Sequence, residues 1–511
     1  MKLAAQLRAL AVSVTAISAA HAQTELTIDQ SAPIGTIQPE VYGQFVEHLG
    51  AGIYDGIWVG EDSDIPNTDG IRDDVFAALD RLEIPVMRWP GGCYADLYHW
   101  RDGIGPRNER AGTVNMAWGG TPESNQFGTH EFFNLAERLG AKTYLNVNLG
   151  TGTPGEAQAW LEYITLPEGS DLANERKANG REKPWKIDYL SIGNETWGCG
   201  GNMRPAFYAD LYAQWATLLQ TAGEAPKRIL SGSHEGNIDY SDEVLDHPGM
   251  GNLADGISLH YYTLPNGDWA DKGEATDFSK AQWAETITRT LRMEDAIERS
   301  LAMIDSHNFE DDFDLYVDEW GMWVNTEEGA PALYQQNTIR DAVVAALNFN
   351  LFHQHADRVP MTNIAQMVNV LQAMILTDGG KMVLTPTYHV FDMYRPFQGA
   401  TALPVSFEAP TYGSGDDAFP ALSASAARTE DGTLVLAFVN ADPEAAHGVT
   451  LQAGDARRAE GRVLSAEEID AHNTFASPNE VQPEEMSVRA KNGTFELGLP
   501  ARSVTVLKLV Q

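Results

Sequence analysis

The chain has 511 residues, of which 43% are apolar and 21% charged, so it is long enough for two globular domains. Its 72 acidic and 35 basic residues give a formal net charge of −37, which argues against nucleic acid or an anionic membrane surface as a partner. A neutral ligand remains compatible with this charge.

The first 22 residues, Met1 to Ala22, have the pattern of a secretory signal. Lys2 and Arg8 form a basic start, residues 10–20 are a short apolar run, and Ala20-His21-Ala22 has the small-x-small form of a cleavage site. We therefore expect cleavage after Ala22 and a periplasmic or secreted protein. The apolar run is too short to span a bilayer, and no later stretch is a transmembrane candidate.

Beyond residue 40, short apolar runs alternate with amphipathic stretches. Strand-like runs begin near residues 41, 84, 142, 186, 228, 255, 313 and 358. Helical periods occur at 69–82, 130–140, 154–164, 205–222, 278–306 and 333–355, and residues 171–183 read as a polar insertion. This alternation is typical of parallel βα units and predicts a (β/α)8 barrel, of the TIM type, over residues 41–402. A doubly wound open sheet is the alternative, but no Gly-x-Gly-x-x-Gly or phosphate-binding loop follows any strand.

The pattern changes near residue 403. Helical periods nearly vanish, and short strands alternate with turns, including Asp431-Gly432 between two apolar runs, which indicates a hairpin. Residues 403–511 are therefore expected to form an all-β sandwich, jelly-roll-like in outline. Residues 23–40 contain a strand near Leu26 that we expect to pack with this β domain.

Polar side chains stand at the carboxyl ends of the predicted barrel strands, where barrels of this kind carry their working groups. Each of them could be a satisfied structural group, but together they predict a polar pocket. The set comprises Glu47, Arg88, Asn146, Asn148, Glu195, His234, His260, Tyr262, Glu319 and Gln366.

Two of these residues are glutamates that end their strands in the same manner. Glu195 follows the run 186–192 and a glycine, and Glu319 follows the run 313–317. Paired carboxyl groups are what cleavage of a glycosidic bond requires, one to protonate the leaving oxygen and the other to attack or stabilise the sugar cation. Arg88 and Tyr262 are placed to hold Glu319 ionised, by charge and by hydrogen bonding.

Five segments resemble those of glycoside hydrolase family 51, the α-L-arabinofuranosidases, and occur in that family's order. They are Tyr42 to Gly50, Arg88 to Gly92, Leu190 to Met203, Val317 to Trp320, and Ala365 to Asn369. The resemblance implies a retaining double displacement that needs no metal or other cofactor, with Glu195 as acid/base and Glu319 as nucleophile. Retention implies carboxyl groups about 5–5.5 Å apart.

The resemblance also implies which residues contact the sugar. The expected set is Glu47, Asn194, Tyr262 and Gln366 on the arabinofuranosyl ring, His260 and Trp118 lining the pocket, and Arg88 supporting the nucleophile. Cys93 departs from the family, because many members have asparagine after the Gly-Gly pair, so that sugar contact is in question. Cys93 and Cys199 are expected either to be bridged, tying the second and fourth strand loops together, or to remain two unpaired thiols.

The function implied is that of an exo-acting α-L-arabinofuranosidase acting on arabinan, arabinoxylan or their oligosaccharides in the breakdown of hemicellulose. The long loop at residues 103–128 favours a closed pocket. An endo-acting glucanase or xylanase on the same barrel is the alternative, followed by a sugar-binding protein without turnover. Members of the family often form oligomers, so a homo-oligomer is compatible with the resemblance.

Overall fold

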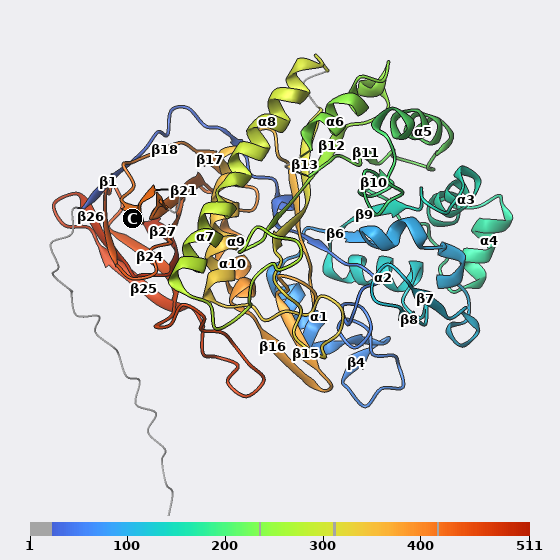
Figure 1. Cartoon of the computed structure of the whole chain (residues 1–511), viewed down its shortest axis with the longest axis horizontal. Coiled ribbons are helices and arrows are strands. Elements are labelled where there is room, and N and C mark those ends of the chain that lie inside the picture. The colour runs from blue at the N-terminus through green and yellow to red at the C-terminus, as the bar shows by residue number, and fades with distance from the viewer. Residues whose placement is uncertain (1–22, 235–236, 310–312, 416–417) are drawn as a thin grey trace, which may run out of the picture.

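The computed structural model describes residues 23–234, 237–309, 313–415 and 418–511 (Figure 1). The proposed signal segment, residues 1–22, lies outside the described residues. Within the described ranges, no helix is both long and apolar enough to cross a membrane.

Eight parallel strands close into a barrel. They are β3 (Gly43–Phe45), β6 (Val86–Trp89), β9 (Lys142–Val147), β10 (Tyr189–Ile192), β11 (Lys227–Leu230), β12 (Gly256–Thr263), β13 (Asp314–Met322) and β14 (Met361–Ile364). Each strand pairs with the next one in the chain, and β14 pairs with β3 to close the ring. The predicted (β/α)8 barrel is confirmed, and the open doubly wound sheet is wrong.

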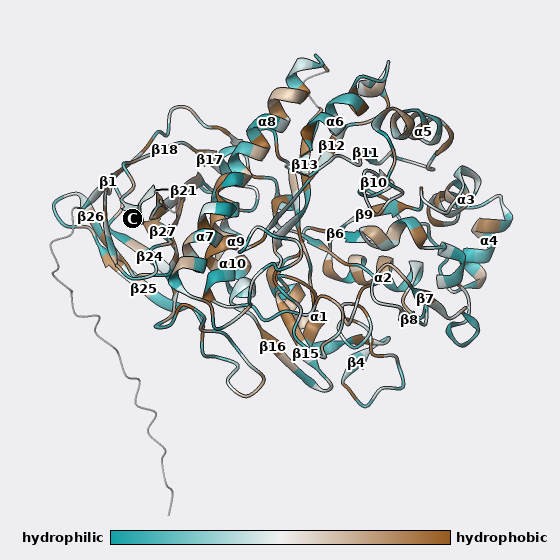
Figure 2. Cartoon of the chain, viewed as in Figure 1, coloured by the Kyte–Doolittle hydropathy of each residue, from teal (hydrophilic) through white to brown (hydrophobic). Residues whose placement is uncertain are grey.

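Helices surround the barrel on the outside. They are α1 (Asp73–Leu82), α2 (Thr129–Leu139), α3 (Pro154–Thr165), α4 (Asp171–Ala178), α5 (Pro205–Leu218), α6 (Ile238–Leu245), α7 (Lys280–Thr290), α8 (Arg292–Ser306), α9 (Ile339–Gln354) and α10 (Pro386–Tyr394). Figure 2 shows both hydrophilic and hydrophobic segments along α7 and α8, as expected of helices with one face on a core and the other in solvent.

The helices differ from the sequence predictions in several places, since α6 and α10 were not predicted and the helix expected from residue 333 begins at Ile339. The single helix expected at 278–306 is divided into α7 and α8 at Leu291, where the amide of Glu294 bonds to the Leu291 carbonyl in a tighter three-residue turn. The polar insertion contains helix α4, which Ser170 caps by accepting from the amide of Ala173. Buried Arg176 anchors α4 by donating to backbone carbonyls of the preceding segment.

Short elements in the connections shape the carboxyl end of the barrel and its surroundings. The 3-10 helices are η1 (Pro39–Tyr42), η2 (Cys93–Leu97), η3 (Trp100–Gly103), η4 (Arg107–Glu109), η5 (Met250–Asn252) and η6 (Arg395–Phe397). The two-stranded ribbons are β4 (Asn67–Thr68) with β5 (Ile71–Arg72), β7 (Thr113–Asn115) with β8 (Thr121–Glu123), β15 (Ile375–Asp378) with β16 (Lys381–Leu384), and β19 (Thr411–Tyr412) with β20 (Phe419–Pro420).

The C-terminal region is built of β-strands in two sheets that enclose a second apolar core. The larger sheet has the order β2 (Gly35–Thr36), β17 (Thr401–Leu403), β21 (Leu422–Arg428), β22 (Leu434–Asn440), β27 (Ser503–Val510), β24 (Arg458–Ser465) and β25 (Glu484–Arg489). The smaller sheet has the order β18 (Val405–Ser406), β1 (Thr24–Ile28), β23 (His447–Gln452) and β26 (Thr494–Leu499). The hairpin expected at Asp431-Gly432 joins β21 to β22.

Helix α9 connects the two parts of the molecule. Residues from Ile339 to His353 along it are all buried, because it contacts barrel strand β13 on one side and strands β21, β22 and β27 on the other. Most of its side chains are apolar, and among the buried polar ones Asn350 donates to Ser423 of a neighbouring strand. The barrel therefore packs on the larger sheet through a continuous apolar core.

Candidate active site

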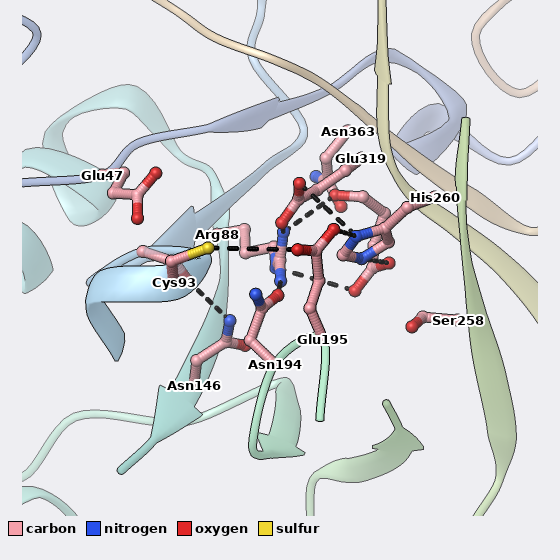
Figure 3. Close-up of polar contacts among 12 residues, drawn as sticks. Glu47, Arg88, Cys93, Asn146, Asn194, Glu195, Ser258, His260, Glu319 and Asn363 are labelled. Atoms are coloured by element: carbon pink, nitrogen blue, oxygen red, sulfur yellow. Dashed lines mark hydrogen bonds and ion pairs between the residues drawn. The ribbon is translucent and has the colours of Figure 1, made fainter. Parts of the chain in front are cut away.

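The two strand-end glutamates meet at the carboxyl end of the barrel. Figure 3 shows Glu195, from the turn after β10, and Glu319, from β13, pointing toward one another with His260 from β12 beside them. One carboxyl oxygen of each glutamate and one ring nitrogen of His260 all lie within 4.8 Å of one another. The pairing expected from the sequence is therefore present in space.

Glu319 is held by two donors. Arg88 Nη1, on β6, donates to Glu319 Oε1 at 2.7 Å, and the hydroxyl of Tyr262 donates to Oε2 at 2.8 Å. Arg88 is fully buried, and although burial disfavours its charge, the carboxylates of Asp318 and Glu319 raise its pKa above the ordinary value. Charge-assisted hydrogen bonds of this kind fix the orientation of the Glu319 carboxyl group.

His260 lies between the carboxylates. Its Nδ1 is 2.8 Å from Glu195 Oε1 and 3.5 Å from Glu319 Oε2, and its Nε2 is 3.1 Å from Asp318 Oδ1. Burial lowers the pKa of His260, but the nearby carboxylates outweigh burial and raise it to about 10. The ring is therefore an imidazolium that donates from both nitrogens and ties these carboxylates together.

The backbone turns sharply around Asn194 and Glu195. Gly193 has a φ of 85°, and Glu195 has a φ of 42°, a left-handed conformation that costs a residue with a side chain about 1–2 kcal/mol. Asn194 is buried and accepts at Oδ1 from Arg88 Nη2 at 2.5 Å, whereas Glu195 is partly exposed. This turn delivers an amide and a carboxyl group side by side at the end of one strand.

A disulfide bridge lies beside the carboxyl group of Glu195. The structure joins Cys93, the first residue of η2, to Cys199 across 106 residues of sequence. Sγ of Cys199 is 3.4 Å from Glu195 Oε2, and Sγ of Cys93 is 3.9 Å from the same oxygen. Of the two alternatives left by the sequence, the structure has the bridge, which links the loops after β6 and β10.

Glu47 follows β3 and completes the site on the side opposite His260 (Figure 3). Its Oε1 accepts from the amide of Tyr94 at 2.9 Å and from Trp118 Nε1 at 3.0 Å, and its Oε2 accepts from Gln366 Nε2 at 3.0 Å. Burial raises the pKa of Glu47 to about 7, against the lowering effect of these donors.

The glycines of the Trp-Pro-Gly-Gly segment are required by close approach. A Cβ on Gly91 would lie 2.8 Å from Glu47 Cγ, and a Cβ on Gly92 would lie 2.8 Å from Glu319 Oε1. Asn146, from β9, donates to the Gly91 carbonyl at 2.6 Å and fixes this loop. The loop passes between Glu47 and Glu319, and only glycine leaves enough room at these two positions.

The structure brings together ten of the residues singled out for the site, namely Glu47, Arg88, Cys93, Trp118, Asn194, Glu195, His260, Tyr262, Glu319 and Gln366. His234 forms a β-bridge with His260, and its ring packs against Trp197. Asn148 belongs elsewhere, since its amide bonds to the Tyr98 carbonyl and to Thr151.

Sequence reasoning missed Asp318. It is buried and pairs with His260 and Arg88, and it accepts from the hydroxyl of Tyr144 at 2.7 Å. Burial raises its pKa, but Arg88 and His260 more than compensate, and the pKa of Asp318 is lowered.

Among the described residues, two groups at this site are close enough to hold a metal ion, Cys93 with Glu195 and Cys199, and Glu195 with His260 and Glu319. In the first group both sulfurs are joined in the disulfide, and in the second the imidazole is protonated. A cysteine binds a metal as a thiolate and a histidine binds one as a neutral imidazole, so neither group fits a metal in this state. The arrangement fits acid–base and nucleophilic chemistry between two carboxyl groups.

Comparison with known proteins identifies the family. The family model described as the α-L-arabinofuranosidase 1 domain matches residues 78–281, and that of the α-L-arabinofuranosidase C-terminal domain matches residues 318–503. A Bacteroides ovatus protein named intracellular exo-α-L-arabinofuranosidase is 45% identical over 508 residues, which cover 98% of each chain. The crystal structure of the GH51 arabinofuranosidase from Xanthomonas axonopodis pv. citri superimposes with a TM-score of 0.92 at 45% identity, covering 95% of this chain and 99% of that one. The chain belongs to the α-L-arabinofuranosidases of glycoside hydrolase family 51.

A more distant α-L-arabinofuranosidase has the same architecture. The α-L-arabinofuranosidase from Thermotoga maritima, solved as an arabinose complex, superimposes with a TM-score of 0.84 at 28% identity and covers 95% of this chain and 100% of that one. The resemblance seen in five sequence segments is thus confirmed along nearly the full length of the chain.

The prediction of export, with cleavage after Ala22, is corrected by the comparison with the Bacteroides ovatus relative. That protein aligns over 98% of this chain and is named intracellular, so the prediction of a periplasmic or secreted protein is wrong. The apolar run at residues 10–20 is diluted by alanine and serine, and such a run is a weaker signal than an uninterrupted apolar one.

Proposed function

We propose that this protein is a retaining, exo-acting α-L-arabinofuranosidase that removes terminal non-reducing α-L-arabinofuranosyl residues. Its substrates are the arabinofuranosyl oligosaccharides derived from arabinan and arabinoxylan, in the degradation of hemicellulose. The observation that carries the proposal is the spacing of Glu195 and Glu319, whose carboxyl oxygens approach within 4.8 Å. Retaining glycosidases have carboxyl groups about 5–5.5 Å apart, whereas inverting enzymes need about 6.5–9.5 Å to admit a water molecule.

The contacts and solvent exposure of the two glutamates indicate which is the nucleophile and which is the acid/base. Glu319, whose side chain is 7% exposed, is fixed by Arg88 and Tyr262 and acts as the nucleophile. Glu195, whose side chain is 18% exposed, is reached from solvent and acts as the acid/base. A leaving group and an attacking water must both reach the acid/base, so greater exposure suits that role.

The reaction proceeds in two displacements. In the first, a carboxylate oxygen of Glu319 forms a bond to the anomeric carbon while the glycosidic bond breaks, and the proton of Glu195 passes to the departing oxygen. In the second, Glu195 takes a proton from water, whose oxygen attacks the anomeric carbon and releases Glu319. Two inversions leave the anomeric configuration unchanged.

The remaining residues of the site bind the sugar in this proposal. Glu47, Asn194 and Gln366 offer acceptors and donors to the ring hydroxyls, and Tyr262 also contacts the sugar. Trp118 stands on the connection between β7 and β8 and donates to Glu47, which closes the site over a terminal residue. Cys93 contacts the sugar as one half of the disulfide.

A proton NMR time course on 4-nitrophenyl α-L-arabinofuranoside tests the reaction. Early release of α-arabinose establishes retention, whereas early β-arabinose means inversion and contradicts the proposal. The absence of cleavage by the folded protein also contradicts it.

Azide added to two variants tests the roles separately. Glu195→Ala should give the α-arabinofuranosyl azide, because azide attacks the intermediate on Glu319. Glu319→Ala should give the β-azide, because azide enters directly in place of the carboxylate. The opposite products would exchange the two roles, and circular dichroism verifies that both variants fold.

A further inference from the structure

We propose that Asp96 is a positioning residue for the acid/base, and that its carboxylate holds the strained turn that presents Glu195. This inference rests on the proposed function and concerns a buried acidic residue that takes no part in the displacement steps. Asp96 lies in η2, three residues after Cys93, and is 2% exposed.

The carboxylate of Asp96 accepts three backbone amides from two different loops. Oδ2 accepts from the amide of Asn194 at 2.9 Å, and Oδ1 accepts from the amides of Leu149 and Gly150 at 2.8 and 3.0 Å. The Asp96 carbonyl also accepts from the amide of Thr151 at 3.0 Å. One side chain therefore joins the loop after β9 to the first residue of the Glu195 turn.

The geometry of the turn explains why this anchor matters. Glu195 has a positive φ, so its conformation persists only where neighbouring contacts fix it. Downstream, the amide of Thr196 bonds to Ser231 Oγ at 3.3 Å, and upstream the amide of Asn194 bonds to Asp96. Without the upstream bond, the peptide before Glu195 can rotate and carry the carboxyl group away from the leaving oxygen.

Helix η2 holds the turn at two points. Asp96 accepts from the amide of Asn194, the first residue of the turn, and Cys93 is joined by the disulfide to Cys199, which follows the turn. Gly200 packs against the same contact, because a Cβ there would lie 2.8 Å from Asp96 Oδ2 and 1.9 Å from the Asn194 carbonyl oxygen. The turn, the carboxylate and the bridge thus form one closely packed unit under the acid/base.

The substitution Asp96→Asn changes this unit with little change in volume. Asparagine has one acceptor oxygen, and that oxygen can keep only one side of the original pattern. If it serves Leu149 and Gly150, the new amide faces the Asn194 amide, so two donors oppose each other directly upstream of Glu195. If it serves Asn194 instead, the loop after β9 loses its acceptor.

The test compares kcat/KM on two leaving groups in the same enzyme preparation. An arabino-oligosaccharide leaves as an alcohol and needs protonation, whereas 4-nitrophenol leaves with little help from an acid. General acid catalysis contributes about 10²–10⁴-fold, and a displacement of about 1 Å can cost about 100-fold. We expect Asp96→Asn to lower kcat/KM for arabinotriose about 10- to 100-fold more than for 4-nitrophenyl α-L-arabinofuranoside.

The matched control is Asp255→Asn. Asp255 accepts from the amide of Arg228 at 2.7 Å at the amino end of the barrel strands, so the same substitution is made at the opposite end of the barrel. In this variant the ratio of kcat/KM for arabinotriose to kcat/KM for 4-nitrophenyl α-L-arabinofuranoside should stay at the wild-type value. Because both substrates meet the same preparation, a partly unfolded fraction cancels from this ratio.

A second variant covers the case in which Asp96→Asn does not fold. Asp96→Ser keeps a small polar side chain but lacks the two carboxylate oxygens that join the loops, so it should also lower kcat/KM for arabinotriose more than for 4-nitrophenyl α-L-arabinofuranoside. An equal loss on both substrates in the folded variants, or no loss, overturns the positioning role. If the wild-type protein cleaves neither substrate, the proposed function itself fails, and the inference fails with it.

Discussion

The substitution Glu47→Gln tests whether a buried carboxyl group of the site destabilises the folded chain above neutral pH. Burial raises the pKa of Glu47 from 4.5 to about 7, so the folded chain binds more protons than the unfolded chain between these values. The stability that Glu47 contributes is therefore complete below pH 4.5 and is lost as the pH rises through 7. At about 1.4 kcal/mol per pKa unit, the loss above pH 7 is about 3 kcal/mol.

A glutamine at position 47 can keep the local hydrogen bonds. Its oxygen can still accept from the Tyr94 amide and from Trp118, and the amide of Gln366 can turn to present its oxygen to the new donor. Unfolding entropy is about 2.1 cal/mol/K per residue, so 3 kcal/mol corresponds to about 3 °C in Tm if the chain unfolds as one unit. We expect Glu47→Gln to lose activity and to melt about 3 °C above the wild-type protein at pH 8.

Scanning calorimetry at pH 5 and pH 8 measures the effect. At pH 5 most of the wild-type contribution is retained, so the gain in Tm should be below about 1 °C. The control is Glu131→Gln, because Glu131 is buried between Arg107 and Arg110, whose charges lower its pKa against the effect of burial. That variant should melt lower at both pH values. A Tm gain in Glu47→Gln that is equal at pH 5 and pH 8, or absent at both, refutes the reasoning.

Three further substitutions follow from the site. Gly92→Ala places a methyl group against Glu319 Oε1 and should lower kcat about 100-fold with little change in Tm, and near wild-type kinetics would contradict the close approach. Tyr262→Phe removes the hydroxyl that donates to Glu319 and should also lower kcat about 100-fold, which steady-state kinetics on the folded variant would reveal or exclude. Replacing Cys93 and Cys199 together by serine should lower the free energy of unfolding by up to about 4–5 kcal/mol through loop-closure entropy, and an unchanged denaturation midpoint would count against this.

The barrel could be predicted from the sequence because its signals are local and repeated. Each strand is a short apolar run followed by a polar residue, and the helices between them have a clear period, as at 69–82. The break at Leu291 could not be predicted, since it follows from a local tightening of hydrogen bonds within a continuous helical pattern. Helix α4 was missed because most of its residues are polar and only Ala173 and Arg176 are buried.

Asp318 was missed because the strand pattern conceals it. In a regular strand, neighbours alternate between faces, so Glu319 in the site would place Asp318 on the outside. The pairing of β13 shifts register between Val317 and Trp320, and that of β12 shifts between Ser258 and His260. A bulge of this kind brings consecutive residues into the same interior, and nothing in the local sequence marks it.

Asp96 shows a different limit of sequence reasoning. The residue has no period or motif of its own, and its decisive contact is with the amide of Asn194, 98 residues later. Only the closing of the barrel, which brings β6, β9 and β10 side by side, places the two together. The chemistry of the glutamate pair could be predicted from residue type, whereas the support of that pair depends on contacts that sequence does not reveal.

The pairing of β1 has a consequence for synthesis of the chain. Thr24 in β1 lies opposite Val449 in β23, and Figure 1 shows this first strand, in blue, among the red strands of the C-terminal region. At a translation rate of roughly 5–20 residues per second, β1 leaves the ribosome roughly 20 to 85 seconds before its partner exists. During that interval the edge of β1 that faces β23 has no native neighbour, while the barrel can already form. The smaller sheet can therefore be completed only when nearly the whole chain has been made. Its strand β1 is among the first segments synthesised, whereas β23 and β26 are among the last.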